Sequence, residues 1–347
     1  MSIETYLRAI PKAELHVHLE GSILPDTLLT LARRNGVTLP AGTVEGLREW
    51  FRFRDFLHFV EIYVTITRCL RTAEDYELIA HEFGAEMARQ NVWYAEATFT
   101  PGTHAALGVP FDVYFAGLTR GRARARADFG VEIAWIFDIV RDNPDPRHAE
   151  YTLWAALEGR GEGVIALGLG GYEAAMPPDG FAPWFERARE AGLHTIPHAG
   201  ETGGPESVWG AIRKLGAERL GHGVRSIEDP ALVAYLAESG IPLEVCPTSN
   251  IRLGIFSGIE THPMRRLHEA GVTVTINSDD PPLFNTTLND EVALLHTGFG
   301  FDLDTIDEIA LNGVRYSCLP PDRKDAMLRQ FQEEMAALKA VHLTEGE

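Results

Sequence analysis

Eight short apolar runs recur along the chain, and stretches with helical spacing of apolar residues separate them. A strand, a helix and a further strand in succession place the two strands parallel. The repeat is tight in the second half, where His198, His222 and Cys246 follow at intervals of 24 residues. Eight such units predict an α/β chain folded as a (β/α)₈ TIM barrel, with a doubly wound open sheet as the alternative. The runs cover 13–19, 92–100, 132–140, 164–169, 194–198, 219–222, 242–246 and 272–278.

The longest insertion into this pattern lies between the first two runs, at about 22–90. A barrel takes roughly 250 residues, so a chain of 347 leaves about 100 for insertions. Apolar residues spaced by three and four from Phe56 onward predict an amphipathic helix, and Asn35-Gly36 predicts the end of an earlier one. One interpretation is that the insertion only covers the barrel. The alternative is that it also covers the mouth of the active site. No linker divides the chain, so we expect a single domain over 1–347.

Charge and cysteine content limit the classes of protein. With 31 basic and 50 acidic residues the formal charge is −19, which disfavours binding to nucleic acids and anionic membranes. The basic run Arg120–Arg126 is interpreted as a solvated helix face. Cys69, Cys246 and Cys318 form no C-x-x-C pair and fit a reducing compartment, so we expect a cytoplasmic protein. No signal peptide or bilayer-spanning segment is expected.

Two histidines stand two residues apart on the first predicted strand. His16 and His18 therefore point to one face, roughly 7 Å apart along the backbone, and could chelate one metal ion. His198 and Asp279 end later strands, at the same end of the predicted barrel. We assign His16, His18, His198 and Asp279 as ligands of one Zn²⁺ per chain, with Fe²⁺, Co²⁺ or Mn²⁺ open by ligand type. None of the four lysines ends a strand to bridge a second metal.

Two further side chains near these ligands have candidate proton-transfer roles. A bound metal lowers the pKa of its water from about 15.7 to about 7, which indicates hydrolytic chemistry. Glu201 follows the ligand His198 by three residues. Burial would raise the pKa of its carboxyl group, as a general acid requires. The alternative for Glu201 is a carboxylate at a helix N-terminus. His222 could orient or deprotonate the water, or be a buried structural histidine.

The ends of the fourth and eighth strands complete the predicted site. Asp280 adjoins a ligand, and a turn at Pro281-Pro282 could bring its carboxylate into the mouth. Gly168, Gly170 and Gly171 would let backbone N–H groups approach a flat ligand, although a tight turn also needs glycine.

Together these residues form a pattern that resembles the adenosine deaminase family of the amidohydrolase superfamily. The motifs occur in family order and are Pro11–Gly21 (PKAELHVHLEG), His198–Glu201 (HAGE), Gly221–Gly223 (GHG), Cys246–Asn250 (CPTSN) and Ser278–Pro281 (SDDP). The resemblance implies a (β/α)₈ barrel with one zinc ion, hydroxide addition at C6 of a purine and loss of ammonia. The signature of nucleic-acid base deaminases, H-x-E followed by P-C-x-x-C, is incomplete because the sequence has no P-C-x-x-C motif.

The resemblance also implies catalytic roles for single residues. Glu201 would protonate N1 of the purine, and His222 and Asp279 would position the attacking hydroxide. Asp280 would bond N7, and the N–H of Gly171 would reach N3.

The same resemblance places His18 and Glu20 at the substrate. Adenosine deaminases usually carry Asp where this chain has Glu20, and that carboxylate reaches the ribose 5′-hydroxyl. The longer arm of Glu20 makes the ribose contact different here.

Several substrates remain open. Adenosine is the first expectation, as a small-molecule purine nucleoside substrate. No nucleic-acid or membrane partner is expected, and the oligomeric state stays open. Segments 51–59 and 275–282 look similar to the aminodeoxyfutalosine deaminases, whose substrate has an aromatic carboxylate in place of the 5′-hydroxyl. Residues 41–71 carry five arginines against four acidic residues, so a lid arginine could accept that carboxylate. Further alternatives are an adenine deaminase, a non-catalytic nucleoside-binding relative, and a different metal hydrolase such as an amidase or phosphotriesterase.

Overall fold

The strands form one eight-stranded sheet that curls into a barrel. The computed structural model describes residues 2–143 and 145–343. Strand order is β1 to β8, and neighbouring strands pair in parallel. This arrangement confirms the predicted (β/α)₈ barrel and excludes the open doubly wound sheet. The strands are β1 Lys12–His18, β2 Val92–Phe99, β3 Glu132–Val140, β4 Val164–Gly170, β5 His194–Ala199, β6 Leu220–His222, β7 Leu243–Val245 and β8 Val274–Ile276.

Strands β1 and β8 meet where the sheet closes on itself. They share one isolated parallel pair, Val17 with Asp279. The N–H of His18 donates to the Asp279 carbonyl at 2.9 Å, and the N–H of Asp279 donates to the His16 carbonyl at 3.0 Å. The residues just after β8 are therefore fixed against β1.

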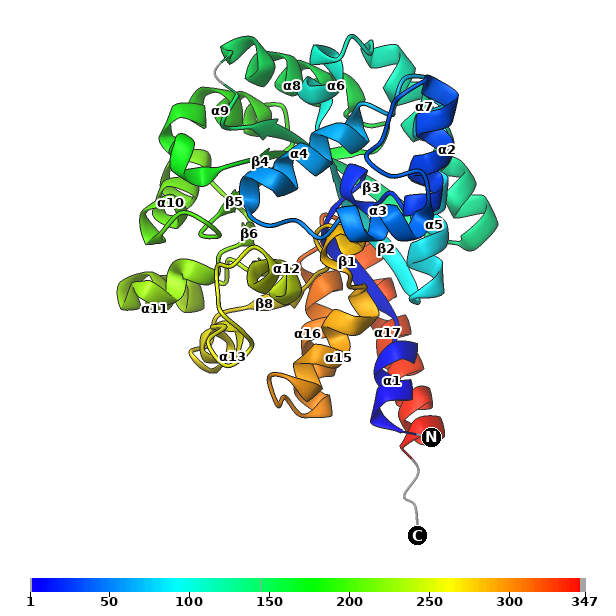
Figure 1. The fold of residues 1–347 in the computed structure, drawn as a ribbon. Coiled ribbons are helices and arrows are strands. Elements are labelled where there is room, and N and C mark those ends of the chain that lie inside the picture. Colours follow the sequence, from blue (N-terminus) through cyan, green and yellow to red (C-terminus); the bar gives the residue numbers. More distant parts are fainter. Residues whose placement is uncertain (1, 144, 344–347) are drawn as a thin grey trace.

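Helices surround the strands (Figure 1). The α-helices are α1 Ile3–Ala9, α2 Pro25–Asn35, α3 Val44–Trp50, α4 Phe56–Thr67, α5 Ala73–Arg89, α6 Pro101–Ala106, α7 Phe111–Phe129, α8 Pro146–Gly159, α9 Ala182–Glu190, α10 Pro205–Gly210, α11 Pro230–Ser239, α12 Pro247–Arg252, α13 Met264–Glu269, α14 Pro281–Phe284, α15 Leu288–Thr297, α16 Leu303–Arg315 and α17 Pro321–His342. Shorter helical turns are η1 Glu20–Ser22, η2 Glu173–Ala175, η3 Pro178–Phe181, η4 Ala211–Leu215 and η5 Val224–Glu228.

Burial on both faces explains why the strands are continuous apolar runs. In β2 and β4 nearly every residue is buried, because one face meets the helices and the other the barrel interior. Ile136, Ala166 and Ile196 form a small apolar cluster from three neighbouring strands. The predicted end of α2 is confirmed, since Gly36 adopts φ +66° and its N–H donates to Ala32.

The insertion after β1 consists of η1 and helices α2, α3 and α4, which precede α5. Helix α5 packs on β2 and α7 in the place of a regular barrel helix. Helix α4 begins at Phe56, as predicted, and has one charged residue, Glu61. In Figure 1 it lies across one end of the barrel.

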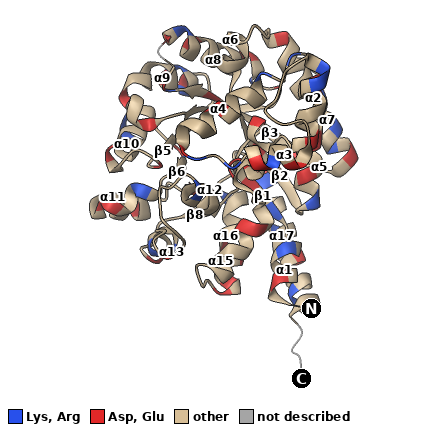
Figure 2. Cartoon of the chain, in the orientation of Figure 1, with Lys and Arg blue, Asp and Glu red and all other residues tan. Residues whose placement is uncertain are grey.

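Basic and acidic residues are interspersed along the outer helices (Figure 2). The basic run 120–126 lies on α7, where Arg120 and Arg124 both donate to Glu77 of α5, at 2.7 and 2.9 Å. Arg122 donates to the Ile133 carbonyl. The run is thus a helix face, as interpreted, but its arginines join α7 to its neighbours. None of the described helices is long and apolar enough to cross a membrane.

Candidate active site

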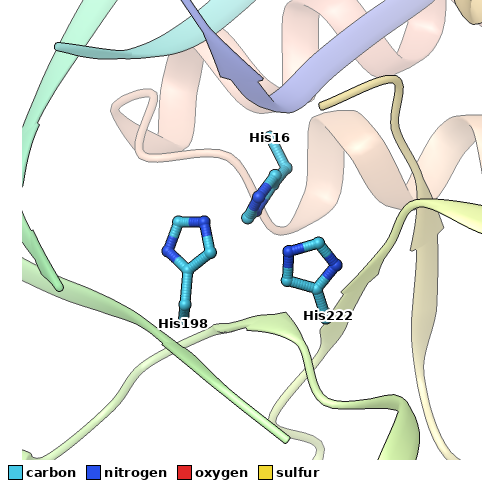
Figure 3. Close-up of side chains that lie close together, drawn as sticks. All are labelled: His16, His198 and His222. Atoms are coloured by element: carbon cyan, nitrogen blue, oxygen red, sulfur yellow. The ribbon is translucent and has the colours of Figure 1, made fainter. Parts of the chain in front are cut away.

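The predicted metal ligands lie together at the C-terminal ends of β1, β5 and β8. Nε2 of His18 lies 3.3 Å from Nε2 of His198 and 3.3 Å from Oδ1 of Asp279. Nε2 of His16 lies 3.7 Å from the same Oδ1 atom. The rings of His16, His198 and His222 point toward a common centre (Figure 3), with centroids 4.5 to 5.3 Å apart.

This donor set fits a metal ion. Four ligands at 2.0–2.1 Å around a tetrahedral Zn²⁺ would lie roughly 3.3 Å from one another, close to the spacings observed. Nε2 of His16 is buried and has no hydrogen-bond partner among the described residues. Such an atom in a polar centre is costly unless a ligand satisfies it. The histidines and Asp279 therefore have the composition and spacing of a metal site.

The protonation states of His18, His198 and Asp279 also suit a metal. Burial lowers the pKa of His18 to about 4 and that of His198 well below its usual value, so both imidazoles are neutral at pH 7. Burial alone would raise the pKa of Asp279, but the surrounding histidines hold it below its usual range. Neutral imidazole and ionised carboxylate are the forms that bind metal ions.

A carboxylate behind His16 fixes the orientation of that ring. Oε2 of Glu244 lies 2.8 Å from Nδ1 of His16, and Oε1 accepts from Nε of Arg219 at 2.6 Å. Arg219 also donates to Glu96 at 2.5 Å, and all four side chains are buried. A hydrogen bond at Nδ1 leaves Nε2 free as the metal-binding nitrogen. Sequence reasoning missed Glu244, whose only signal is an acidic residue inside an apolar strand.

Two residues of the site have a backbone conformation that non-glycine residues rarely adopt. His222 has φ +60° and Asp279 has φ +65°. Such conformations cost on the order of 1–3 kcal/mol each and concentrate at functional sites. His222 is the last residue of β6 and Asp279 follows β8, so the strained backbone lies at the metal group itself.

A chain of polar contacts orients His222. Nδ2 of Asn250 lies 3.1 Å from Nδ1 of His222, and Oδ1 of Asn250 lies 3.2 Å from Nε2 of His262. With Asn250 donating to Nδ1, the proton of neutral His222 sits on Nε2. That atom lies 3.6 Å from Oε1 of Glu201 and 3.8 Å from Oδ2 of Asp279. Burial lowers the pKa of His222 to about 4.

The loop that carries Glu201 is held by a second carboxylate. Glu173 accepts hydrogen bonds from the backbone N–H groups of Gly200, Glu201 and Thr202, at 2.9, 2.8 and 3.1 Å. Burial, followed by the charges of Asp279 and Glu173, raises the pKa of Glu201 well above its usual value. Glu201 precedes the first residue of α10, Pro205, so it is not a first-turn helix carboxylate. Sequence reasoning missed Glu173.

A cavity of about 820 Å³, solvent at its mouth included, opens beside these residues. Predicted substrate residues His18, Gly171 and Asp280 line it, together with Glu201, His222 and Asp279. Burial raises the pKa of Asp280 well above its usual value, and its Oδ1 has no hydrogen-bond partner among the described residues. The remaining lining residues are Phe56, Phe59, Val60, Tyr63, Val64, Thr100, Thr103, Asp138, Val140, Asp142, His198 and Leu253.

Glu20 is placed differently from the other predicted substrate residues, because it does not line this cavity. Its side chain is fully buried. Oε1 accepts from the N–H of Thr100 at 3.1 Å and lies 3.0 Å from Nε2 of His104, and Oε2 accepts from the hydroxyl of Tyr63 at 3.3 Å.

The five arginines of residues 41–71 also stay outside the cavity. Each is exposed, and none is among the residues that line it. Helix α4 instead contributes an apolar, largely aromatic wall to the cavity.

A (β/α)₈ barrel with histidines and an aspartate at the C-terminal ends of its strands defines a metal-dependent hydrolase. The family model described as adenosine deaminase matches residues 11–334, and the chain belongs to the adenosine deaminase family. Members of this family are hydrolytic deaminases that act on C–N bonds. Membership argues against an amidase or phosphotriesterase.

Similar proteins are named for related substrates. An aminodeoxyfutalosine deaminase of Streptomyces coelicolor is 41% identical over 337 residues, which are 96% of this chain and 87% of that protein. The crystal structure of an adenine deaminase from Arthrobacter aurescens is similar with a TM-score of 0.89 and 32% identity, covering 94% of this chain and 99% of that one. An amidohydrolase from Burkholderia ambifaria with bound Zn has a TM-score of 0.90 and 28% identity, with coverage of 97% and 94%.

Proposed function

We propose that this protein hydrolyses the 6-amino group of an adenine nucleoside and releases ammonia. The observation that carries the proposal is one cavity that joins the histidine–aspartate group and Glu201 to a large apolar wall. The apolar wall comes from helix α4, so the cavity extends from the metal group to the insertion after β1.

Zinc is the metal we assign to the site. His16, His18, His198 and Asp279 would hold it, in agreement with the buried, unpaired Nε2 of His16 and with the Zn-bound amidohydrolase relative. When bound, zinc supplies a water molecule of lowered pKa as the nucleophile.

The side chains around the metal group divide the proton transfers between them. Glu201, with its raised pKa, donates a proton to N1 of the purine. His222 directs its Nε2 proton toward Asp279 and Glu201 and orients the nucleophile beside them. Asp280, also with a raised pKa, donates to N7, and the N–H of Gly171 at the cavity wall donates to N3. Protonation of N1 draws electrons from C6, where the amino group leaves.

Among the substrates, we rank aminodeoxyfutalosine above adenosine, which the sequence favoured first. The apolar wall of Phe56, Phe59, Val60 and Val64 suits a 5′-substituent with an aromatic ring better than a bare hydroxyl. The Streptomyces relative supports this order. Adenine is the second candidate, because the similar Arthrobacter structure is an adenine deaminase.

An ammonia-release assay with aminodeoxyfutalosine, adenosine and adenine tests the proposal, with kcat/KM and metal content measured on the same preparation. We expect about one zinc per chain and the highest kcat/KM for aminodeoxyfutalosine. A protein without transition metal that stays inactive after zinc addition would contradict the proposed function. A preference for adenine would contradict the nucleoside assignment alone.

A further inference from the structure

A buried carboxyl group in the cavity has no part in the chemistry described above. Asp138 lies on β3, is 3% exposed and lines the cavity. The hydroxyl of Thr100, just after β2, donates to its Oδ1 at 2.7 Å. No other described side chain donates to this carboxyl group, so Oδ2 is available to a ligand.

The end of β4 leaves room for Asp138. A Cβ atom at Gly170 would lie 2.5 Å from Oδ2 of Asp138, and one at Gly168 would lie 3.1 Å from its Cβ. These glycines therefore make space for the carboxyl group on the neighbouring strand.

The position of Asp138 in the barrel indicates which part of a substrate it meets. With the order β1 to β8, strands β2 and β3 lie across the barrel from β6 and β7. His222, at the end of β6, thus lies on the far wall, whereas the residues after β8 lie beside β1. In a purine the glycosidic N9 lies on the five-membered ring, at the end of the molecule remote from C6. A base whose N1, N3 and N7 meet Glu201 after β5, Gly171 after β4 and Asp280 after β8, as proposed above, directs its N9 substituent toward the wall that runs from β1 to β3.

We propose that Asp138, held by Thr100, accepts a hydrogen bond from a ribose 2′- or 3′-hydroxyl and so selects nucleosides over the free base. This inference rests on the proposed function, because it uses the same cavity and the same orientation of the base. It assigns ribose recognition to a residue that the sequence motifs do not mark, whereas Glu20 is engaged in its own buried contacts.

The electrostatics of Asp138 agree with this role. Burial raises the pKa of Asp138 to about 7, and the nearby charge of Glu20 contributes. A carboxyl group with few hydrogen-bond donors behaves in this way. A ligand hydroxyl that donates to Oδ2 stabilises the ionised form.

The test compares substrates that differ by a single hydroxyl. We would measure kcat/KM for adenosine, 2′-deoxyadenosine and 3′-deoxyadenosine with the wild-type protein and with the Asp138→Ala and Asp138→Asn variants. Each ratio of two substrates is taken on one preparation, so it does not depend on the fraction of folded enzyme. An analogue that turns over too slowly is measured as a competitive inhibitor.

We expect the wild-type protein to prefer adenosine over one of the two analogues by about 10- to 100-fold, as is typical for a hydrogen bond to a charged partner. In Asp138→Ala this preference should fall to about 3-fold or less, with Asp138→Asn in between. Asp142→Asn is the matched control, because Asp142 lines the same cavity but is exposed. It should leave the ratio within about twofold.

The outcomes separate this inference from the proposed function. An active wild-type enzyme that ignores both hydroxyls, or whose preference survives in Asp138→Ala, overturns the role of Asp138 and leaves the deaminase proposal standing. An equal loss of preference in Asp142→Asn also overturns it, because the effect would then be one of general charge. A wild-type protein that deaminates neither nucleosides nor adenine overturns both.

Discussion

The carboxylate of Glu244 should set the affinity of the protein for zinc although it is not a ligand. Its Oε2 lies 2.8 Å from Nδ1 of His16, and both side chains are at most 3% exposed. The hydrogen bond fixes the ring and increases the basicity of Nε2. Glu244→Gln removes the charge but keeps the shape, and Arg219 retains Glu96 as an ionic partner.

Loss of such a contact typically lowers metal affinity by about 10- to 100-fold, or roughly 1.4–2.7 kcal/mol. Titration of zinc against a chromogenic chelator measures this directly. Glu218→Gln is the matched control, because Glu218 contacts Nδ1 of His194 at 2.7 Å in the same way but about half of each side chain is exposed. It should leave the zinc affinity unchanged. A zinc affinity of Glu244→Gln within twofold of the wild-type value would refute the reasoning, as would an equal loss in Glu218→Gln.

Three further predictions concern other parts of the site. Glu201→Gln should keep its zinc and lose about 10²- to 10⁴-fold in kcat, because the proton donor is removed; metal analysis with an ammonia assay checks this, and full activity would contradict it. Gly21→Ala should lower kcat/KM by about 100-fold at an unchanged melting temperature, since its Cβ would lie 1.6 Å from Oδ1 of Asp280 and displace that side chain. Asp138→Asn should gain stability over the wild-type protein as pH rises. The raised pKa of Asp138, about 7, makes its ionisation cost about 1.4 kcal/mol per pH unit between about pH 4 and 7 and nothing further above. Urea unfolding at pH 5 to 8 measures the difference, and a difference that does not vary with pH counts against it.

The parts of the molecule that could be predicted from sequence are those with a regular spacing. The strands are predictable as apolar runs because both of their faces are buried. The ligands are predictable because they stand at the ends of these runs. Their predicted bounds differ from the observed ones by up to two residues, since the outermost pairs of β6 to β8 fall outside the regular ladder.

The parts that could not be predicted depend on contacts between distant residues. The resemblance places Glu20 at the substrate, but Thr100 and His104, some 80 residues later, contact its carboxylate. Glu173 and Asp138 belong to no recognisable sequence motif. The contact of Glu173 with backbone N–H groups, and the position of Asp138 beside two glycines, are visible only in the structure. The glycines at the end of β4 were interpreted as an approach for a flat ligand, yet two of them accommodate a neighbouring side chain.

The closure of the barrel gives the metal site a second consequence, for assembly of the chain. Among the described residues, strand β1 is bridged to the segment after β8 by the pair Val17–Asp279. Asp279 is itself a proposed ligand, and the ligands His16 and His18 flank Val17. An ion held there would cross-link the first and last strands, whose contacts have the greatest sequence separation in the sheet and form at the highest entropic cost. Zinc would then stabilise the closure of the barrel in addition to its role as a cofactor, and its loss would first weaken the contact between β8 and β1.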